Sequence, residues 1–229
     1  MKPYGRKTKK KVLRILDTKP RAQALSQLEG IPDQQLVGHL FSFFYHMDDR
    51  IKFRSVTAMG FLARRISGTR MEKARIILRR IMWNLNDESG GIGWGSPEAM
   101  GEILSKSPEL AVEFKSILFS YLDHRGNHIE HEMLQRGVLW GIGTYLETAP
   151  DDLTQTTKDQ IQAHLTSNDP VKRGYAARAL INANAMGCGE MPQQIASDVA
   201  CIDIYTGWNF INTRISDMAY ACSVQAATA

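Results

Sequence analysis

Cysteine is scarce in this 229-residue chain, and its few thiols exclude a covalent framework. The three cysteines, Cys188, Cys201 and Cys222, are odd in number, widely spaced and confined to the last fifth of the sequence. They match neither a set of disulfide pairs nor the paired spacing of a zinc motif. We therefore predict that a packed core holds the chain together, and 43% of hydrophobic residues is enough to build one.

Long apolar runs are missing as well. The densest apolar patch, LFSFFYHM at residues 40–47, is far shorter than the roughly 20 residues that a membrane-spanning helix needs. The lysine-rich N-terminus is followed only by VLRIL, which is too short and too interrupted by charge for the core of a signal peptide. We therefore expect a cytoplasmic protein with no membrane partner.

A nucleotide-binding loop is also lacking, although one stretch has part of its composition. SGGIGWGSPE, residues 89–98, holds four glycines and then a predicted helix start, but no strand precedes it and no Lys-Ser or Lys-Thr follows it. We interpret the stretch as a turn between two helices. Ser96 is then expected to be the N-cap of the second helix, and the glycines are expected to adopt positive φ angles or to pack too tightly for a Cβ.

The alternative interpretation of this stretch is a local binding site. Glycines let a ligand approach the backbone closely, and a tryptophan offers an aromatic ring beside it. The candidate binding residues are Trp83, Asp87, Gly91, Gly93 and Trp94. No cofactor motif accompanies them, so no cofactor is predicted.

Acidic residues are few in the first third of the chain, which is therefore strongly basic. Residues 1–82 carry 19 Lys and Arg against 6 Asp and Glu, whereas residues 83–229 carry 9 against 18. A basic end attracts polyanions or acidic protein surfaces. The candidate polyanion-binding residues are Lys7, Lys9, Lys10, Lys11 and Arg14, within the basic segment 1–14. The alternative is a solvated, partly frayed tail.

Helical periodicity, by contrast, is abundant and recurs at a regular interval. Small-residue triplets begin at Ala22, Ala58, Ala99, Gly141 and Ala177, with separations of 36, 41, 42 and 36 residues. These separations are typical of a two-helix repeat, in which small residues let the second helices lie close together. The first helices are predicted near residues 6–16, 32–44, 69–85, 107–122 and 154–165. The residues expected to be buried at helix contacts are Ala58, Gly60, Ala99, Gly101, Gly141, Gly143, Ala177 and Ala179.

Two segments resemble the second helix of a HEAT repeat. NDPVKRGYAARAL, residues 168–180, has Asp-Pro at the helix start, a hydrophobic-basic pair and inward alanines, and DDRIKFRSVTAMGFLA, residues 48–63, is similar but lacks the proline. The chain thus resembles HEAT-repeat (armadillo-like) proteins of an uncharacterised bacterial type. The resemblance implies an all-α fold, a HEAT-like right-handed α-solenoid of about five helix pairs over residues 1–185.

The C-terminal segment, residues 186–229, departs from this pattern and is expected to cap the array. IDIYTGWNFINT alternates in hydrophobicity around Thr-Gly, which predicts a β-hairpin. A helix from Pro192 to about Ala200 is expected before it.

The resemblance implies a non-catalytic scaffold that mediates protein–protein interaction. The first alternative is nucleic-acid binding by phosphate contacts through the basic first third, which needs no base readout. The second is an enzyme, because Trp83, Asp87 and Trp94 are similar in type to groups of the HEAT-like alkylpurine DNA glycosylases, which act on a damaged nucleotide.

Histidines cluster near residues 124–131. His128, His131 and Glu132 lie within one helical turn and are weak candidates for metal ligands. A polar turn between helices has the same composition, so we predict no metal site.

Overall fold

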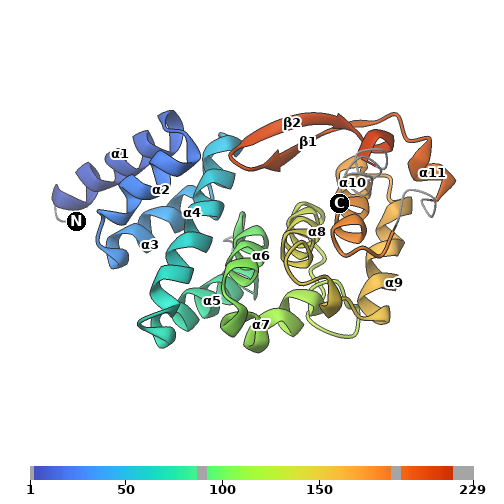
Figure 1. Cartoon of the computed structure of the whole chain (residues 1–229), viewed down its shortest axis with the longest axis horizontal. Coiled ribbons are helices and arrows are strands. Elements are labelled where there is room, and N and C mark those ends of the chain that lie inside the picture. The colour runs from blue at the N-terminus through green and yellow to red at the C-terminus, as the bar shows by residue number, and fades with distance from the viewer. Residues whose placement is uncertain (1–2, 87–91, 187–191, 219–229) are drawn as a thin grey trace, which may run out of the picture. The chain divides into compact units, whose positions relative to one another are not determined.

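The computed structural model describes residues 3–86, 92–186 and 192–218. Most of these residues are helical, and one two-stranded antiparallel sheet is found among them (Figure 1). The predicted all-α class is therefore supported. Contacts divide the chain into two compact units, one made of residues 1–112 and 205–209 and the other of residues 113–204 and 210–229. This division falls inside the predicted array of residues 1–185.

The first unit is built around one long central helix, α4. Helices α1, α3, α5 and α6 each pack against α4. The elements are α1 (Pro3–Thr18), α2 (Arg21–Glu29), α3 (Asp33–Phe43), α4 (Asp49–Ser67), α5 (Met71–Asn86), α6 (Ser96–Lys106) and the start of α7 (Pro108–Ser120). The first-helix predictions agree with α1, α3, α5 and α7 to within a few residues at each end.

Close packing of α4 on α6 depends on small residues. A Cβ added to Gly60 would lie 3.0 Å from the carbonyl oxygen of Glu102, so a larger side chain would push the two helices apart. Ala58 and Ala99 are almost fully buried. The burial predicted for eight small residues in the last four triplets is confirmed, whereas Ala22 of the first triplet, for which no burial was predicted, is exposed.

The second unit contains α8 (Glu132–Leu146), α9 (Gln155–Ala163), α10 (Pro170–Asn182) and α11 (Gln193–Ala196), with short 3-10 turns η1 (Pro150–Asp152) and η2 (His164–Thr166). Helix α9 agrees with its prediction. Asp169 caps α10 by accepting a hydrogen bond from the Val171 N–H, and Pro170 occupies the first helical position. Gly143 lets α8 approach Ala179 of α10, since a Cβ would lie 3.2 Å from the Ala179 Cα.

The predicted helix after Pro192 is shorter than expected. It ends at Ala196, because Asp198 turns the chain by accepting hydrogen bonds from Arg173 and from the Ala200 N–H. The predicted β-hairpin follows and is confirmed, with strands β1 (Cys201–Thr206) and β2 (Asn209–Arg214). Gly207 makes the turn with a φ of 67°, which favours glycine.

The hairpin tip, residues 205–209, packs in the first unit around the buried side chain of Arg54. The Arg54 guanidinium donates hydrogen bonds to the carbonyl oxygens of Leu16, Asp17 and Trp208 and to the side chain of Asn209, at 2.7–2.9 Å. It also lies 5.3 Å from the centre of the Trp208 ring. One arginine therefore fixes both the C-terminal end of α1 and the hairpin tip.

Across these described residues, no helix is long and apolar enough to cross a membrane.

Candidate functional site

One face of α1 is basic and exposed, and the opposite face is buried. Val12, Ile15 and Leu16 pack into the core of the first unit. This packing contradicts the alternative of a frayed tail for the described residues of α1. Besides Lys9, the exposed basic side chains are Arg6, Lys7, Lys10, Lys11 and Arg14. Lys7, Lys10, Lys11 and Arg14 follow the spacing i, i+3, i+4, i+7, so they share one side of the helix.

These five cations have no carboxylate partner among the described residues, unlike Arg65, Arg70, Arg75 and Arg79. Asp33 binds both Arg65 and Arg70. Glu72 binds both Arg75 and Arg79. Five cations without a carboxylate partner among the described residues therefore lie on this one helix, and we call this set of five side chains the α1 basic face.

Lys9, the remaining candidate, takes a different position. Its Nζ lies 5.4 Å from the centre of the Phe43 ring, a cation–π contact that turns it toward α3. Burial, and then the charge of Lys9, lower the pKa of His39. Lys9 thus lies beside the basic face and contributes less to it than its neighbours.

The glycine-rich stretch is described only from Ile92 onward, so Asp87 and Gly91 lie outside the described residues. Glycine is required at position 93 because the backbone there lies close to the end of α5. A Cβ at this position would lie 2.6 Å from the carbonyl oxygen of Asn84. Gly95 has a φ of 70° and contacts Phe44, which confirms the expected positive φ.

The predicted cap of α6 is wrong. Gly95 occupies the N-cap position, and Ser96 is already the first helical residue. The Ser96 hydroxyl is buried and has no hydrogen-bond partner among the described residues. The chain enters α6 from a left-handed glycine, which shifts the helix start by one residue relative to the sequence pattern.

The two candidate tryptophans differ in exposure. Trp83 lies near the end of α5 with 73% of its surface exposed, whereas Trp94 is half-buried. The described part of the stretch is a tight turn before α6. For the alternative of a binding site, one of the candidate aromatic side chains, Trp83, is well exposed. Its candidate carboxylate, Asp87, lies outside the described residues.

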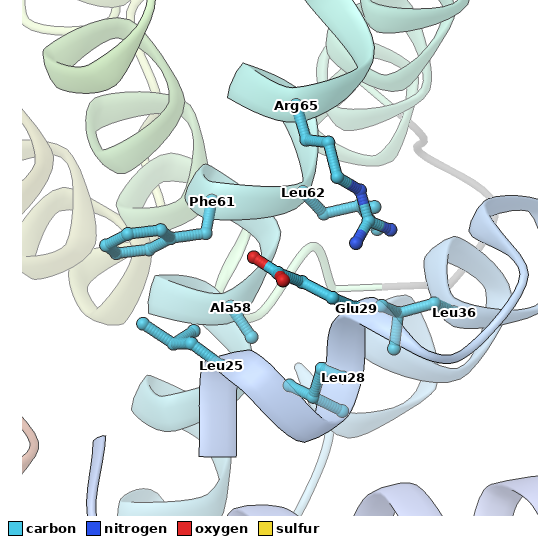
Figure 2. Close-up of a pocket in the computed structure, with 8 residues that line it drawn as sticks. All are labelled: Leu25, Leu28, Glu29, Leu36, Ala58, Phe61, Leu62 and Arg65. Carbon is cyan, nitrogen blue, oxygen red and sulfur yellow. The ribbon is translucent and has the colours of Figure 1, made fainter. Parts of the chain in front are cut away.

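A small pocket lies between α2 and α4, and we call it the α2–α4 pocket (Figure 2). Its volume is about 40 Å³. Its lining residues are Leu25, Leu28, Glu29, Leu36, Ala58, Phe61, Leu62 and Arg65. The pocket could not be found from sequence spacing, since its lining comes from three different helices, α2, α3 and α4. The only sequence signal is Phe61, which follows the small-residue triplet on α4.

The histidine cluster of the second unit does not form a metal site. The His131 Nδ1 accepts a hydrogen bond from the Met133 N–H and so caps α8, while Glu132 forms an ion pair with Lys172. His128 lies 3.4 Å from the Gln135 side-chain nitrogen. No group of His, Cys, Asp and Glu in the described part of the chain is placed to hold a metal ion.

Burial shapes the titration of two histidines in this cluster. Burial, and then the nearby His124, lower the pKa of His128. Burial, and then the charge of Lys172, lower the pKa of His164. Both imidazoles are therefore more easily kept neutral in the folded protein than in an unfolded chain.

Comparisons with known proteins add similarity without a function. No family model matches the sequence. The chain is 27% identical over 181 residues to an uncharacterized protein of Archaeoglobus fulgidus, a match that covers 78% of this chain and 91% of that protein. A crystal structure of an engineered protein, a Northeast Structural Genomics Consortium target, is similar with a TM-score of 0.44 and 14% identity. That match covers 80% of this chain and 82% of the other.

Proposed function

We propose that the first unit binds polyanions, and nucleic acid in particular, through phosphate contacts along the α1 basic face. The observation that carries this proposal is a stripe of exposed Lys and Arg with no carboxylate partner among the described residues. A cation that is not already neutralised can replace a counterion condensed on a phosphate, and the release of that counterion favours binding. Such contacts position a protein on nucleic acid without reading its sequence.

The length of the stripe suits a few adjacent phosphates. Lys7 and Arg14 are seven residues apart on one helix, which corresponds to about 10 Å along its axis. One strand of a duplex carries a phosphate about every 3.4 Å along its axis, so the stripe spans about three phosphate-to-phosphate steps and matches about four phosphates.

Insertion of α1 into a membrane is a poorer explanation of the same residues. An amphipathic membrane helix places its apolar face among the lipid tails. In this protein Val12, Ile15 and Leu16 are buried in the first unit, so the apolar face is already occupied. Only the charged side remains available to a ligand.

We further propose that the helix pairs follow a HEAT-like right-handed arrangement within each unit. Support comes from the close packing of α4 on α6 and of α8 on α10 at the small-residue positions. A cytoplasmic location and a role without catalysis belong to the same proposal. We do not propose glycosylase activity, because Asp87 of the candidate trio lies outside the described residues.

Protein–protein interaction is the second candidate function. The α2–α4 pocket favours it, because the pocket is apolar at its base and has an exposed aromatic ring on its rim. The two functions use different surfaces of the first unit, so each can be tested without the other.

The decisive experiment for polyanion binding compares two four-site variants of the full chain. In one, Lys7, Lys10, Lys11 and Arg14 are replaced by Gln. In the matched control, Lys73, Arg75, Arg79 and Arg80 of α5 are replaced by Gln. Binding to a labelled DNA duplex and an RNA duplex is followed by fluorescence anisotropy between about 50 and 200 mM salt.

We expect the affinity of the natural chain to fall steeply with salt. Because each phosphate contact contributes about 0.9 to the slope of log K against log salt, the α1 variant should have a slope smaller by about 3 to 4. The α5 variant should change much less. Equal losses in both variants, or no binding at the lowest salt, would reject the proposal. Binding confined to anionic lipid vesicles would reject nucleic acid as the ligand.

A further inference from the structure

We propose that Gln135 couples the protonation of His128 to the position of residues 123–131, so that mild acid releases this segment from α8. The segment lies in the second unit, between α7 and α8. It then acts as a pH-sensitive switch, whose open form exposes the side chain of Ile129. The inference is independent of the functions proposed for the first unit.

Two partners fix the orientation of the Gln135 side-chain amide. Gln135 lies in α8 and is 6% exposed, and its side-chain nitrogen donates a hydrogen bond to the Ile129 carbonyl oxygen at 2.8 Å. Its side-chain oxygen accepts a hydrogen bond from the ammonium group of Lys172, which is also buried. A carbonyl oxygen can only accept and an ammonium can only donate. A flipped amide would satisfy neither partner, so one orientation is allowed.

This orientation determines the form of His128 that the folded segment accepts. The His128 Nε2 lies 3.4 Å from the Gln135 side-chain nitrogen, which has a second N–H to donate. Nε2 must therefore be the acceptor, and the neutral ring carries its proton on Nδ1. A protonated His128 has an N–H at both nitrogens, so two donors would face each other. The contact of the segment with α8 is compatible with the neutral form alone.

Neighbouring rings and charges also disfavour a proton on His128. The rings of His124 and His128 are stacked, with centres 3.9 Å apart and planes tilted by 31°. Burial, and then His124, lower the pKa of His128, and the charge of Lys172 acts in the same direction. The charged or titratable groups around His128 are Asp123, His124 and Glu130 of its own segment, His164 of η2, Lys172 of α10 and Glu132 of α8, which pairs with Lys172.

Opening of the segment removes these constraints. His128 in the open form leaves Gln135 and the His124 ring, so its pKa returns toward the usual 6.5. The closed form binds the proton less tightly, so acid favours the open form as pH falls below about 6.5. The effect stops growing once the closed form is itself protonated. For one proton, the ratio of open to closed molecules rises by up to about ten-fold between pH 7.5 and pH 5.5.

Two backbone amides separate local opening from global unfolding. The Ile129 N–H donates a hydrogen bond to the Tyr121 carbonyl oxygen at 3.1 Å, and the Ile129 side chain is 7% exposed. Release of the segment breaks this bond and exposes the amide to solvent. Leu139, in the middle of α8, is fully buried and should stay protected. Hydrogen exchange at Ile129 therefore reports the switch, and exchange at Leu139 reports unfolding of the helix.

The test is an NMR experiment on the full chain at pH 7.5 and pH 5.5. Long-range ¹H–¹⁵N spectra identify the ring nitrogen of His128 that carries the proton, and hydrogen exchange is corrected for the intrinsic effect of pH on amide exchange. We expect the Nδ1–H form at pH 7.5. The opening equilibrium at Ile129 should be greater at pH 5.5 by up to about ten-fold, with a much smaller change at Leu139.

Three variants test the role of the Gln135 contact. His128→Gln removes the titrating group, so opening at Ile129 should be the same at both pH values. Gln135→Glu supplies a carboxylate, which can accept from protonated His128 and from Lys172 together, so the pH dependence should vanish or reverse. The matched control His164→Gln removes a histidine of the same cluster that is not among the hydrogen-bond partners of the Gln135 side chain, and it should keep the dependence. Circular dichroism checks that each variant is folded.

Several results would overturn the proposal. A proton on Nε2 of His128 at pH 7.5 would contradict the assigned hydrogen bonds, and this measurement needs no variant. The proposal also fails if exchange at Ile129 does not respond to pH, or if folded His128→Gln or Gln135→Glu keeps the dependence of the natural chain. An equal rise in exchange at Ile129 and Leu139 would mean that acid unfolds α8 as a whole, with no local switch.

Discussion

Helices α1 and α5 are each sixteen residues long and rich in Lys and Arg, yet they present different surfaces. On α5, Glu72 in the first turn binds Arg75 and Arg79, and the Arg80 guanidinium lies 4.0 Å from the centre of the Phe41 ring. On α1, the five side chains of the α1 basic face have no such partners among the described residues, and Lys9 alone contacts an aromatic ring. Two helices that are both rich in Lys and Arg therefore differ in how much of their positive charge is available to a ligand.

The position of a single carboxylate explains much of this difference. The hydrogen bond from Arg79 lowers the pKa of Glu72, and the ion pair with Arg75 acts in the same direction. The acid of α1, Asp17, lies near its end and faces Arg50 of α4. No carboxylate therefore lies among the cations at the start of α1.

The largest effect should come from detaching the end of α1. Arg54→Met removes a buried cation that serves the Leu16, Asp17 and Trp208 carbonyl oxygens. Those carbonyls would remain partly buried without a donor, so unfolding free energy should fall by about 3 kcal/mol. Urea denaturation would measure it. The control Arg50→Met, which removes a half-exposed cation, should cost less than about 1 kcal/mol. If Arg54→Met and Arg50→Met lower the free energy of unfolding by similar amounts, the buried hydrogen bonds of Arg54 do not stabilise the end of α1 more than a surface ion pair does.

The second prediction concerns a variant in which α1 gains an acidic residue near its start, as α5 has at Glu72. Lys7→Glu removes one cation and places a carboxylate three and four residues before Lys10 and Lys11. It should reduce the salt slope of nucleic-acid binding by about 2 to 3, because one contact is lost and two are neutralised. The free energy of unfolding should be unchanged within about 0.5 kcal/mol. A slope that changes by only one contact would mean that the neighbouring lysines do not respond to the new acid.

The third prediction converts α5 toward α1. Glu72→Gln releases Arg75 and Arg79, so nucleic-acid affinity at low salt should rise, with a slope larger by up to about 2. Anisotropy titrations on the same duplex would measure the change. The effect is smaller than in α1, since Arg80 stays on Phe41. Unchanged binding would indicate that the face of α5 is turned away from the ligand.

The smallest effect concerns the second unit, where burial lowers the pKa values of two histidines. Because the pKa values of His128 and His164 are lowered from the usual 6.5, the unfolded chain takes up protons before the folded protein does as pH falls. Unfolding free energy should therefore fall as pH drops below about 6.5. Urea denaturation at pH 7.5 and at pH 5.5 would show it, and His164→Gln should reduce the dependence. A free energy of unfolding that is the same at both pH values would contradict the lowered pKa values of His128 and His164.

Local signals predicted much of the fold. The helix starting at Asp169-Pro170 and the hairpin around Gly207 depend on residues close in sequence, and both are present. The start of α6 was missed by one residue, because the tight fit of Gly95 against Phe44 of another helix outweighs the preference of Ser96 for the N-cap. The end of α11 was missed because Arg173, from α10, binds Asp198.

Local sequence is enough to predict the helical period, the small-residue contacts, the hairpin and the excess of positive charge near the N-terminus. These features depend on backbone preferences and on composition, which act over a few residues. Which cations keep their charge for a ligand, and where a pocket opens, depend on contacts between distant parts of the chain. Asp33 neutralises arginines 32 and 37 residues away, and α2, α3 and α4 together line the pocket. Ion pairs and cavities depend on distances in space, and packing sets those distances.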